Sequence, residues 1–217
     1  MNRKSEMQLE RLIERYPVLE VCREDIRAAF EIIQDTYQSK GRLLVCGNGG
    51  SGADAEHIVG ELMKEFAIRR PLGEAERERL LEVSQEYGSV LAQSLQGALP
   101  AIPLTGNLAL STAYANDAVP ELVFAQQAYG YGDENSAILG ISTSGNSKNV
   151  IYAIVAAKAK GMRSIGLTGR DGGKMAKLCD VCICVPADFT PDVQELHLPV
   201  YHALCRMIEE AFFGRDI

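Results

Sequence analysis

Residues 43–57 read LLVCGNGGSGADAEH, and this stretch decides the fold. An apolar run of four residues breaks into glycines, an asparagine and a serine, and a helix-compatible segment follows. Strands of a buried parallel sheet are near-continuous apolar runs, and glycines allow the chain to turn tightly. The stretch therefore predicts a strand, a turn and a helix, which is the repeating unit of parallel α/β proteins.

The same alternation continues along the chain. Short apolar runs alternate with helical patterns of 10–15 residues, as expected for βαβ units. We therefore predict an α/β fold with a three-layer, doubly wound (flavodoxin-like), five-stranded parallel sheet, whose ligands bind at the carboxyl ends of the strands. The expected strands are 42–46, 100–104, 136–142, 162–169 and 180–186, and the expected helices are 53–66, 121–130, 149–161 and 192–213.

Two further helical regions lie outside this alternation. Residues 5–40 carry apolar residues at three- and four-residue steps, and Pro17 divides them into two helices. Residues 72–99 are charged, helical in pattern and without strand signals, so we expect a helical element inserted on the surface. We expect residues 1–217 to form one domain, with N-terminal helices in 1–40 and the insertion in 70–99.

Composition narrows the class of protein. Apolar residues make up 47% and charged residues 24% of the 217 residues, which is typical of globular proteins. The net charge of −7 argues against a nucleic-acid partner. No window approaches the roughly 18 apolar residues of a membrane span, and the charged N-terminus lacks the apolar core of a signal peptide. We expect a cytoplasmic protein with reduced cysteines.

The cysteine-rich stretch CDVCICVP (179–186) allows two interpretations. One CxxC pair suggests a metal knuckle, but a second pair is missing. The residues alternate like a buried strand, in which cysteine acts as a small hydrophobic residue. The strand is the favoured interpretation.

Two predicted strand ends carry candidate binding loops. CGNGGS (46–51) lets a backbone approach a ligand, but its glycines fit neither the GxGxxG nor the Walker A pattern, so we expect no nucleotide cofactor. GISTSGNS (140–147) places four hydroxyls before a helix, and hydroxyls together with free helix N–H groups suit a phosphate. The hydroxyls belong to Ser142, Thr143, Ser144 and Ser147.

Four side chains on two helices are candidates for the chemistry. His57 and Glu61 are four residues apart, on one helix face. Gln194 and His202 are eight residues apart on the last helix. A lone histidine on a helix is more often structural, but the joint pattern favours a site. These side chains suit either an acid–base set or a borderline metal site.

At these motifs the chain resembles the phosphoheptose isomerases. The motifs are CGNGGSGADAEHIVGEL, AND (115–117), GISTSGNSKNV, LTGRDGGKMA and QELH followed by His202. These enzymes have a sugar-isomerase (SIS) domain and convert sedoheptulose 7-phosphate to D-glycero-D-manno-heptose 7-phosphate, in the biosynthesis of ADP- or GDP-heptose. The resemblance runs from about residue 20 to 213 and is interrupted near 70–100.

The resemblance implies a role for each matching residue. The four hydroxyls would hold the phosphate, Glu61 would also contact the substrate, and Glu61 and His202 would be the acid–base pair. The remaining contacts to the sugar would come from Asn48, Gly49, Gly50, Ser51, Asn116, Asp117 and Gln194. In some family members the residues corresponding to His57, Glu61, Gln194 and His202 bind one Zn²⁺ per subunit. The family also implies a homotetramer with sites between subunits.

Three departures leave alternatives open. The insertion at 70–99 is absent from the compact family pattern, Pro199 lies inside the last helix, and Pro191 stands where some members have an acidic residue. One alternative is a non-catalytic SIS regulator that binds sugar phosphates or a replication initiator, and another is an isomerase of a different ketose phosphate. Because His202 is retained together with Glu61, the phosphoheptose isomerase is favoured. The sequence admits both a zinc site and a metal-free acid–base pair.

Overall fold

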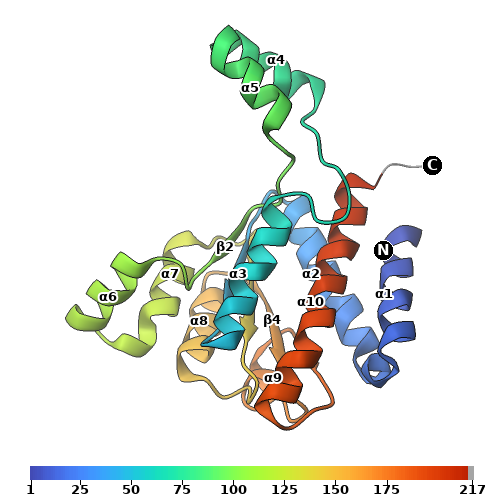
Figure 1. Cartoon of the computed structure of the whole chain (residues 1–217). Helices are drawn as coiled ribbons and strands as arrows, with labels where there is room; N and C mark the ends of the chain where they lie inside the picture. Colours follow the sequence, from blue (N-terminus) through green and yellow to red (C-terminus); the bar gives the residue numbers. More distant parts are fainter. Residues whose placement is uncertain (215–217) are drawn as a thin grey trace.

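A computed structural model describes residues 1–214 and contains one sheet of five parallel strands (Figure 1). The strand order is β2-β1-β3-β4-β5, which is that of doubly wound flavodoxin-like folds. β1 pairs with β3 so that Leu43 lies opposite Ala137 and Cys46 opposite Gly140. The strands are β1 (Leu43–Cys46), β2 (Ala101–Pro103), β3 (Ala137–Ile141), β4 (Arg163–Thr168) and β5 (Val181–Cys184).

The sheet is covered on both faces, which explains its continuous apolar runs. All residues of β1 and β3 are buried. Because alternate residues of a strand point to opposite faces, Leu43 and Val45 enter one apolar core while Leu44 and Cys46 enter the other. The expected three-layer architecture is therefore confirmed.

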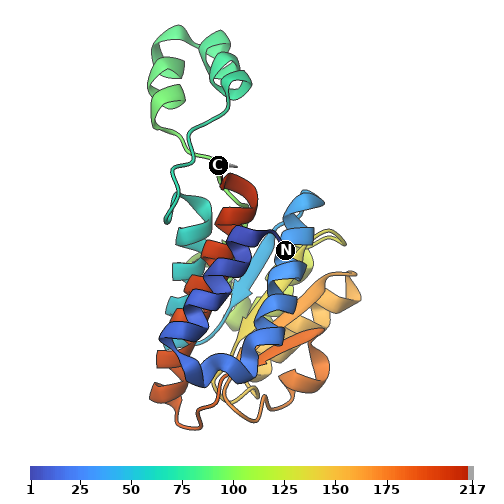
Figure 2. The ribbon, with the colours of Figure 1, turned by 90° about the vertical axis from the view of Figure 1, so that its right-hand side faces the viewer.

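Each face has its own set of helices (Figures 1 and 2). One core packs α1, α2, α3 and α10 against the sheet, and the other packs α7, α8 and α9. The helices of the first face are α1 (Arg3–Arg15), α2 (Arg23–Gln38), α3 (Gly50–Met63) and α10 (Thr190–Phe213), with the 3₁₀ helix η1 (Pro17–Cys22). Those of the second are α7 (Val123–Tyr131), α8 (Lys148–Ala159) and α9 (Met175–Leu178), with η2 (Pro120–Leu122) and the outer helix α6 (Leu108–Asp117).

The insertion forms a pair of helices, α4 (Glu74–Val83) and α5 (Gln85–Ser94), that projects from the body (Figure 1). Its two chain ends are held together by an isolated bridge between Pro71 and Gln96 and by a hydrogen bond of 2.7 Å from the Gly97 N–H to the Arg70 carbonyl. The expected helical insertion is confirmed.

The observed elements differ from the expected ones in their boundaries and by two helices that were not predicted. α3 begins at Gly50 rather than at residue 53, because Gly49 adopts a positive φ of 55° and turns the chain into the helix early. α6 was not predicted, since no residue in it is buried and it has no apolar stripe to reveal it. α9 was also missed because it is a single turn. α10 runs through Pro199 as one helix.

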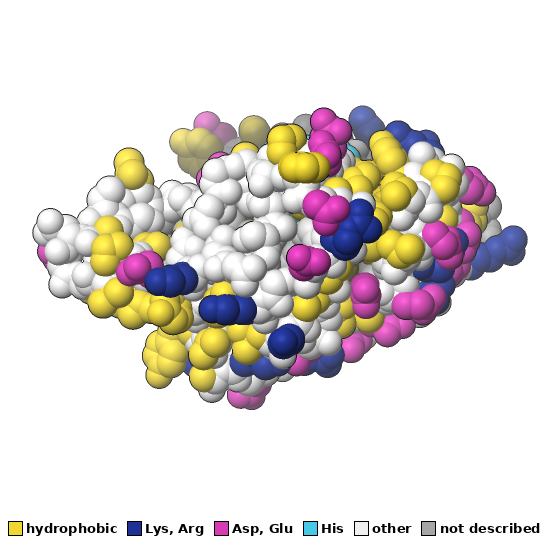
Figure 3. Space-filling model, turned by 90° about the horizontal axis from the view of Figure 1, so that it is seen from below, with side chains coloured by type: hydrophobic (Ala, Val, Ile, Leu, Met, Phe, Trp, Pro, Cys, Tyr) yellow, Lys and Arg dark blue, Asp and Glu magenta, His cyan; other side chains and the backbone are white. Residues whose placement is uncertain are grey.

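The lower end of the molecule in Figure 1 is where the strands end and where α3 and α10 begin. Seen from below, the middle of this face carries mostly uncharged polar side chains and backbone (Figure 3). Within residues 1–214, no helix combines the length and apolar character that a membrane crossing requires.

Candidate functional site

The sheet changes its winding direction between β1 and β3. β1 leads through α3 to β2 on one side, and β3 leads through α8 to β4 on the other. Ligands of doubly wound proteins bind in the crevice at such a point. Here the loop after β1 contacts the first turn of α8, because the amides of Asn48 and Asn149 exchange hydrogen bonds of 2.9 and 2.8 Å.

The hydroxyl loop after β3 is tightly folded. The Ser142 and Ser147 hydroxyls lie 2.9 Å apart, and Ser144 accepts from the Asn146 N–H at 3.2 Å. Gly145 has a φ of 62°, and a Cβ there would lie 2.1 Å from the Gly172 carbonyl oxygen. The loop therefore presents short hydroxyls at the start of α8, where the first helix N–H groups have no partner within the helix.

The glycine turn before α3 makes room for a side chain of α10. A Cβ on Gly50 would lie 2.5 Å from the Gln194 side-chain nitrogen, so only glycine allows Gln194 its position. Ser51 is buried in the first turn of α3. The structure thus brings Gln194 to the same end of the sheet as the two loops.

Farther along the contact between α3 and α10 lies a second polar group. Asp54, His57 and Glu61 are three and four residues apart, so they share one face of α3. His57 Nε2 lies 3.1 Å from Glu61 Oε1, and His57 Nδ1 lies 3.0 Å from the Tyr201 hydroxyl. Tyr201 in turn donates to Asp54 Oδ1 at 3.2 Å.

This hydrogen-bond order determines where protons sit. With its hydroxyl donating to Asp54, Tyr201 accepts from Nδ1–H of His57. A hydrogen bond between His57 Nε2 and Glu61 Oε1 requires a proton on one of these two atoms. Burial, the largest influence on Asp54, raises the pKa of its carboxyl group. A side-chain pair that shares a proton can give or take one.

His202 completes this group from α10. Its ring centroid lies 5.0 Å from that of His57 and 5.4 Å from that of Phe66. Burial, followed by the nearby His57, lowers the pKa of His202, so its imidazole is neutral at pH 7. Its Nε2 atom is buried and has no hydrogen-bond partner among the described residues. Since buried polar atoms are nearly always paired, the unpaired nitrogen makes His202 a candidate for contact with a ligand.

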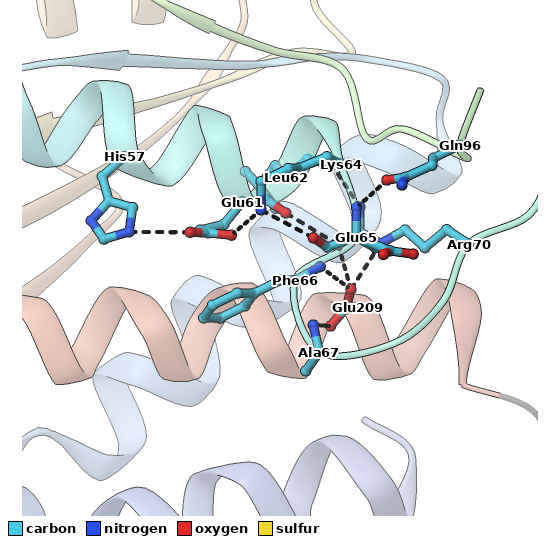
Figure 4. Close-up of polar contacts among 10 residues, drawn as sticks. All are labelled: His57, Glu61, Leu62, Lys64, Glu65, Phe66, Ala67, Arg70, Gln96 and Glu209. Carbon is cyan, nitrogen blue, oxygen red and sulfur yellow. Dashed lines mark hydrogen bonds and ion pairs between the residues drawn. The ribbon is translucent and has the colours of Figure 1, made fainter. Parts of the chain in front are cut away.

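A buried ion pair holds the end of α3 against α10 (Figure 4). The side chains of Arg70 and Glu209 are fully buried, and Arg70 Nη2 lies 2.8 Å from Glu209 Oε1. Arg70 also donates to the carbonyls of Leu62 and Glu61, at 2.8 and 3.2 Å. Glu209 accepts from the N–H groups of Phe66 and Ala67 at 2.9 and 2.8 Å. The ion pair thus ties the segment that follows Glu61 to the helix that carries His202.

The structure arranges the candidate residues in two groups and sets one pair apart. The loops and Gln194 lie at the carboxyl end of the sheet, and His57, Glu61 and His202 lie farther up α3 and α10. Gly50 and Glu61 are about 16 Å apart along the helix, at 1.5 Å per residue. Asn116 and Asp117 end α6 at the outer edge of the molecule (Figure 1), and Asn116 donates to Asp117 at 2.8 Å.

Several residues of this region were missed by sequence reasoning. Asp54 could have been predicted from the sequence, because it extends the helical stripe of His57 and Glu61 by one step. No local pattern predicts the other three, Tyr201, Arg70 and Glu209, because their partners are more than 130 residues away. The third histidine, His197, is fully buried in α10, and burial lowers its pKa to about 4.

The candidate zinc ligands are side chains of types that bind Zn²⁺, but the structure does not arrange them around one point. Imidazole, carboxylate and amide oxygen are suitable donors for Zn²⁺, and the unpaired Nε2 of His202 is a free donor. However, no cluster of three or more His, Cys, Asp or Glu side chains within residues 1–214 is arranged to hold a metal ion. Gln194 lies against Gly50, away from the histidines.

Comparison with known proteins identifies the relatives of this chain. Two family models described as SIS domain match residues 8–77 and 108–205. Over 179 residues the chain is 40% identical to a phosphoheptose isomerase from Aneurinibacillus thermoaerophilus, covering 82% of this chain and 77% of that protein. Over 198 residues it is 38% identical to a phosphoheptose isomerase from Helicobacter pylori strain P12, covering 91% and 90%.

A solved structure agrees with these matches. The phosphoheptose isomerase from Neisseria gonorrhoeae superposes with a TM-score of 0.70 at 32% sequence identity, covering 95% of this chain and 91% of that one. Residues 78–107, which include most of α4 and all of α5, lie between the two ranges that the family models match.

Proposed function

The chain belongs to the phosphoheptose isomerases, the sugar-phosphate isomerases of the SIS-domain family, and we propose that Glu61 and His202 carry its reaction. The reaction interconverts sedoheptulose 7-phosphate and D-glycero-D-manno-heptose 7-phosphate, within the biosynthesis of ADP- or GDP-heptose. The observation that carries the assignment is the buried, unpaired Nε2 of His202 beside the contact between His57 and Glu61.

The carbon-bound proton is assigned to Glu61. An aldose–ketose interconversion moves a proton between C1 and C2 through an enediol, so one base must take and return it. The Glu61 carboxylate is suited to this because its side chain is only 13% exposed and is held by His57 and by Lys64, whose Nζ lies 3.0 Å away. His57 keeps the carboxylate oriented and can share its proton.

The protons of the two sugar oxygens are assigned to His202. A neutral imidazole can donate from one nitrogen and accept at the other, and the lowered pKa of His202 keeps it neutral at pH 7. Its unpaired Nε2 can bond to O1 or O2 of the sugar. Because Phe66 and Tyr201 pack around the ring, they limit the access of water to it.

The phosphate is assigned to the loop of Ser142, Thr143, Ser144 and Ser147, and the sugar hydroxyls to the glycine turn and Gln194. An extended chain from C1 to the phosphorus has eight bonds, which is about 10 Å at roughly 1.2 Å per bond. This is shorter than the rise of about 16 Å from Gly50 to Glu61. The mismatch supports sites that combine residues of more than one subunit, as in the homotetramer that we propose, with Asn116 and Asp117 contributing from α6.

The chain also carries the four residue types that bind zinc in some family members. The four residues that the resemblance names as zinc ligands, His57, Glu61, His202 and Gln194, are not grouped around one point in this chain, because Gln194 lies against Gly50. The steps assigned above need no metal.

We further propose that residues 1–217 are one SIS domain and that the protein acts in the cytoplasm.

The assignment is tested by turnover of sedoheptulose 7-phosphate. Glu61→Gln and His202→Ala should each lower kcat by about 10²–10⁴-fold, the usual contribution of a positioned acid or base. Glu56→Gln is the matched control, because Glu56 is an exposed carboxylate on the same helix. The wild-type sample should also be analysed for bound metal. Wild-type protein that binds sugar phosphates without turnover, with or without Zn²⁺, would instead be a non-catalytic SIS module.

A further inference from the structure

The projecting helix pair, residues 74–94, has no core of its own; we call it the arm. No residue of α4 is buried, and Gly88 is the only buried residue of α5. A Cβ on Gly88 would lie 2.1 Å from the Leu80 carbonyl oxygen, so the two helices meet backbone to backbone. No other helix or strand makes an extensive contact with either.

An arm of this kind needs a partner surface. Isolated helices shorter than about 12–15 residues are marginal in water, and ordering each residue costs about 1–2 kcal/mol. The arm offsets little of this cost, because its large apolar side chains are exposed. They are Val83 (87% exposed), Tyr87 (69%), Val90 (64%) and Leu91 (40%), with Leu95 (47%) just beyond.

These side chains lie together. Tyr87, Val90 and Leu91 are three or four residues apart, so they form one stripe along α5, with Leu95 directly after its end and Val83 at the turn between α4 and α5. Contiguous exposed apolar patches mark interaction surfaces. The stripe is the face of the arm that another surface should cover.

A groove between α1 and α10 has the matching properties. It encloses a cavity of 270 Å³ whose lining combines apolar residues, such as Leu12, Tyr16 and Leu198, with polar and charged ones, and His202 borders it. Three arginines line it as well: Arg11, Arg15 and Arg206. We call it the arginine groove.

None of the three arginines forms an ion pair with a carboxylate among residues 1–214, although Glu209 and Glu210 act on Arg206 at longer range. Arg206 Nε is buried without a hydrogen-bond partner among the described residues. Burial, then Arg11 and Arg15, lower the pKa of Arg206. Glu195 is the one carboxylate among the residues that line the cavity. Incoming carboxylates would therefore be favoured there.

The arm supplies such carboxylates beside its apolar stripe. Residues 74–86 contain five glutamates and two arginines, and Glu82 and Glu86 flank Val83 and Tyr87. The arm cannot use the groove of its own chain, because it projects away from α1 in both ribbon views (Figures 1 and 2). A second copy of the chain is the occupant that presents this combination.

We propose that the arm of one subunit docks in the arginine groove of a second copy, with its apolar stripe on the apolar residues of the groove and its glutamates on the arginines. The docked arm covers the cavity that His202 borders and limits the entry of water there. The contact between the two subunits does not depend on the proposed function. Only its effect on turnover rests on that function.

Reciprocal charge reversal tests the contact. Arg11→Glu with Arg15→Glu in the groove, and Glu82→Arg with Glu86→Arg in the arm, should each weaken self-association at least tenfold in sedimentation velocity. A protein carrying all four changes should recover most of the association. Glu31→Arg, an exposed reversal on α2, is the control and should change nothing.

A second pair of variants tests the apolar stripe. Tyr87→Ser with Leu91→Ser should lower the sedimenting mass by at least one association step. Tyr152→Ser with Val155→Ser, which removes similarly exposed side chains from α8, should not. Far-UV circular dichroism checks that each variant is folded, and the arm's lack of contacts with the body predicts that it is.

The proposal is overturned if folded arm variants associate like the wild type. It is equally overturned if the arm variants weaken association while the groove variants do not. The same holds if the protein with all four charge reversals does not recover association. Sedimentation needs no substrate, so these outcomes do not depend on the isomerase assignment. If association and isomerase activity fall together, the docked arm also contributes to turnover by covering the cavity that His202 borders.

Discussion

At the scale of single residues, the site depends on a few long-range contacts. Glu61 is held by His57, and His57 by Tyr201 and Asp54. Arg70 bonds to the backbone carbonyl of Glu61 and to the side chain of Glu209. The position of the proposed base is therefore determined by His57 together with Tyr201, Asp54, Arg70 and Glu209, to which no step of the reaction is assigned.

Glu209→Gln should destabilise the protein strongly. The change keeps the side-chain shape but leaves the buried Arg70 charge without its partner, which typically costs about 3–5 kcal/mol. Urea denaturation would measure the loss of unfolding free energy. The matched control is Asp188→Asn, whose exposed ion pair with Arg170 should contribute at most about 1 kcal/mol. Equal effects of the two changes would contradict the assignment.

His197 should make stability depend on pH. Burial lowers its pKa to about 4 in the folded state, while the unfolded chain has a pKa near 6.5. The unfolded state therefore binds more protons below pH 6.5, so stability is full above that value and is lost as the pH falls toward 4. The loss from this residue should be about 1.5 kcal/mol between pH 6.5 and 5, from 1.36 kcal/mol per pKa unit.

Comparing wild type with His197→Gln isolates this contribution from that of the carboxylates. Unfolding free energies measured at several pH values should fall less steeply for the variant. Parallel curves would show that His197 is not held neutral in the folded protein.

At the scale of elements, the contact between α3 and α10 organises both parts of the site. α3 contributes Asp54, His57 and Glu61 on one face, and α10 contributes Gln194, Tyr201 and His202. Local periodicity predicts which residues share a face of each helix. It does not predict that the two faces meet, because this follows from how both helices pack on the sheet.

Gly50→Ala should affect substrate binding rather than folding. The added Cβ would lie 2.5 Å from the end of the flexible Gln194 side chain, which can move away. Losing about one hydrogen bond to the sugar, worth roughly 0.5–1.5 kcal/mol, corresponds to a roughly two- to thirteenfold rise in KM.

Gly60→Ala is the matched control on the same helix. A Cβ there meets nothing within 4 Å, so KM should stay unchanged while stability rises by about 0.5–1 kcal/mol. If both variants raised KM equally, the position of Gln194 would not explain the effect of Gly50→Ala.

At the scale of the whole molecule, the winding of the sheet places the loops. β1 and β3 are neighbours although residues 47–136 separate them in sequence. Their ends therefore meet at the point where the helices change sides, and this brings the glycine turn beside the hydroxyl loop. A ligand bound there contacts segments from both halves of the chain.

Phosphorylated ligands should therefore stabilise the whole fold. A ligand at 100 times its dissociation constant adds about 2.7 kcal/mol to the unfolding free energy, and each kcal/mol raises Tm by roughly 2–4 °C at this chain length. Differential scanning fluorimetry with sedoheptulose 7-phosphate and with inorganic phosphate would measure the shift. Ser142→Ala should reduce it for both ligands at fixed concentration, whereas Ser39→Ala should not. An unchanged shift in Ser142→Ala would remove this hydroxyl from the phosphate site.

The sequence by itself determined the strands, most helices and the two strand-end loops. Each is a local pattern: an apolar run, a helical period, or glycines and hydroxyls between them. The parallel five-stranded sheet follows from the alternation of these patterns, and the family follows from the motifs that the loops carry. Only the boundaries, such as the early start of α3 at Gly50, and the short or exposed helices α6 and α9 escaped prediction.

The tertiary structure alone decided which distant groups meet. Arg70 bonds to Glu209 across 139 residues, and Tyr201 bonds to Asp54 across 147. It also separated Gln194 from the histidines and left the arm without a core. Such contacts depend on how helices pack on both faces of the sheet, and no spacing along the chain encodes that packing. The sequence thus determined the chemical groups, and the packing of α3 against α10 decided how they are combined.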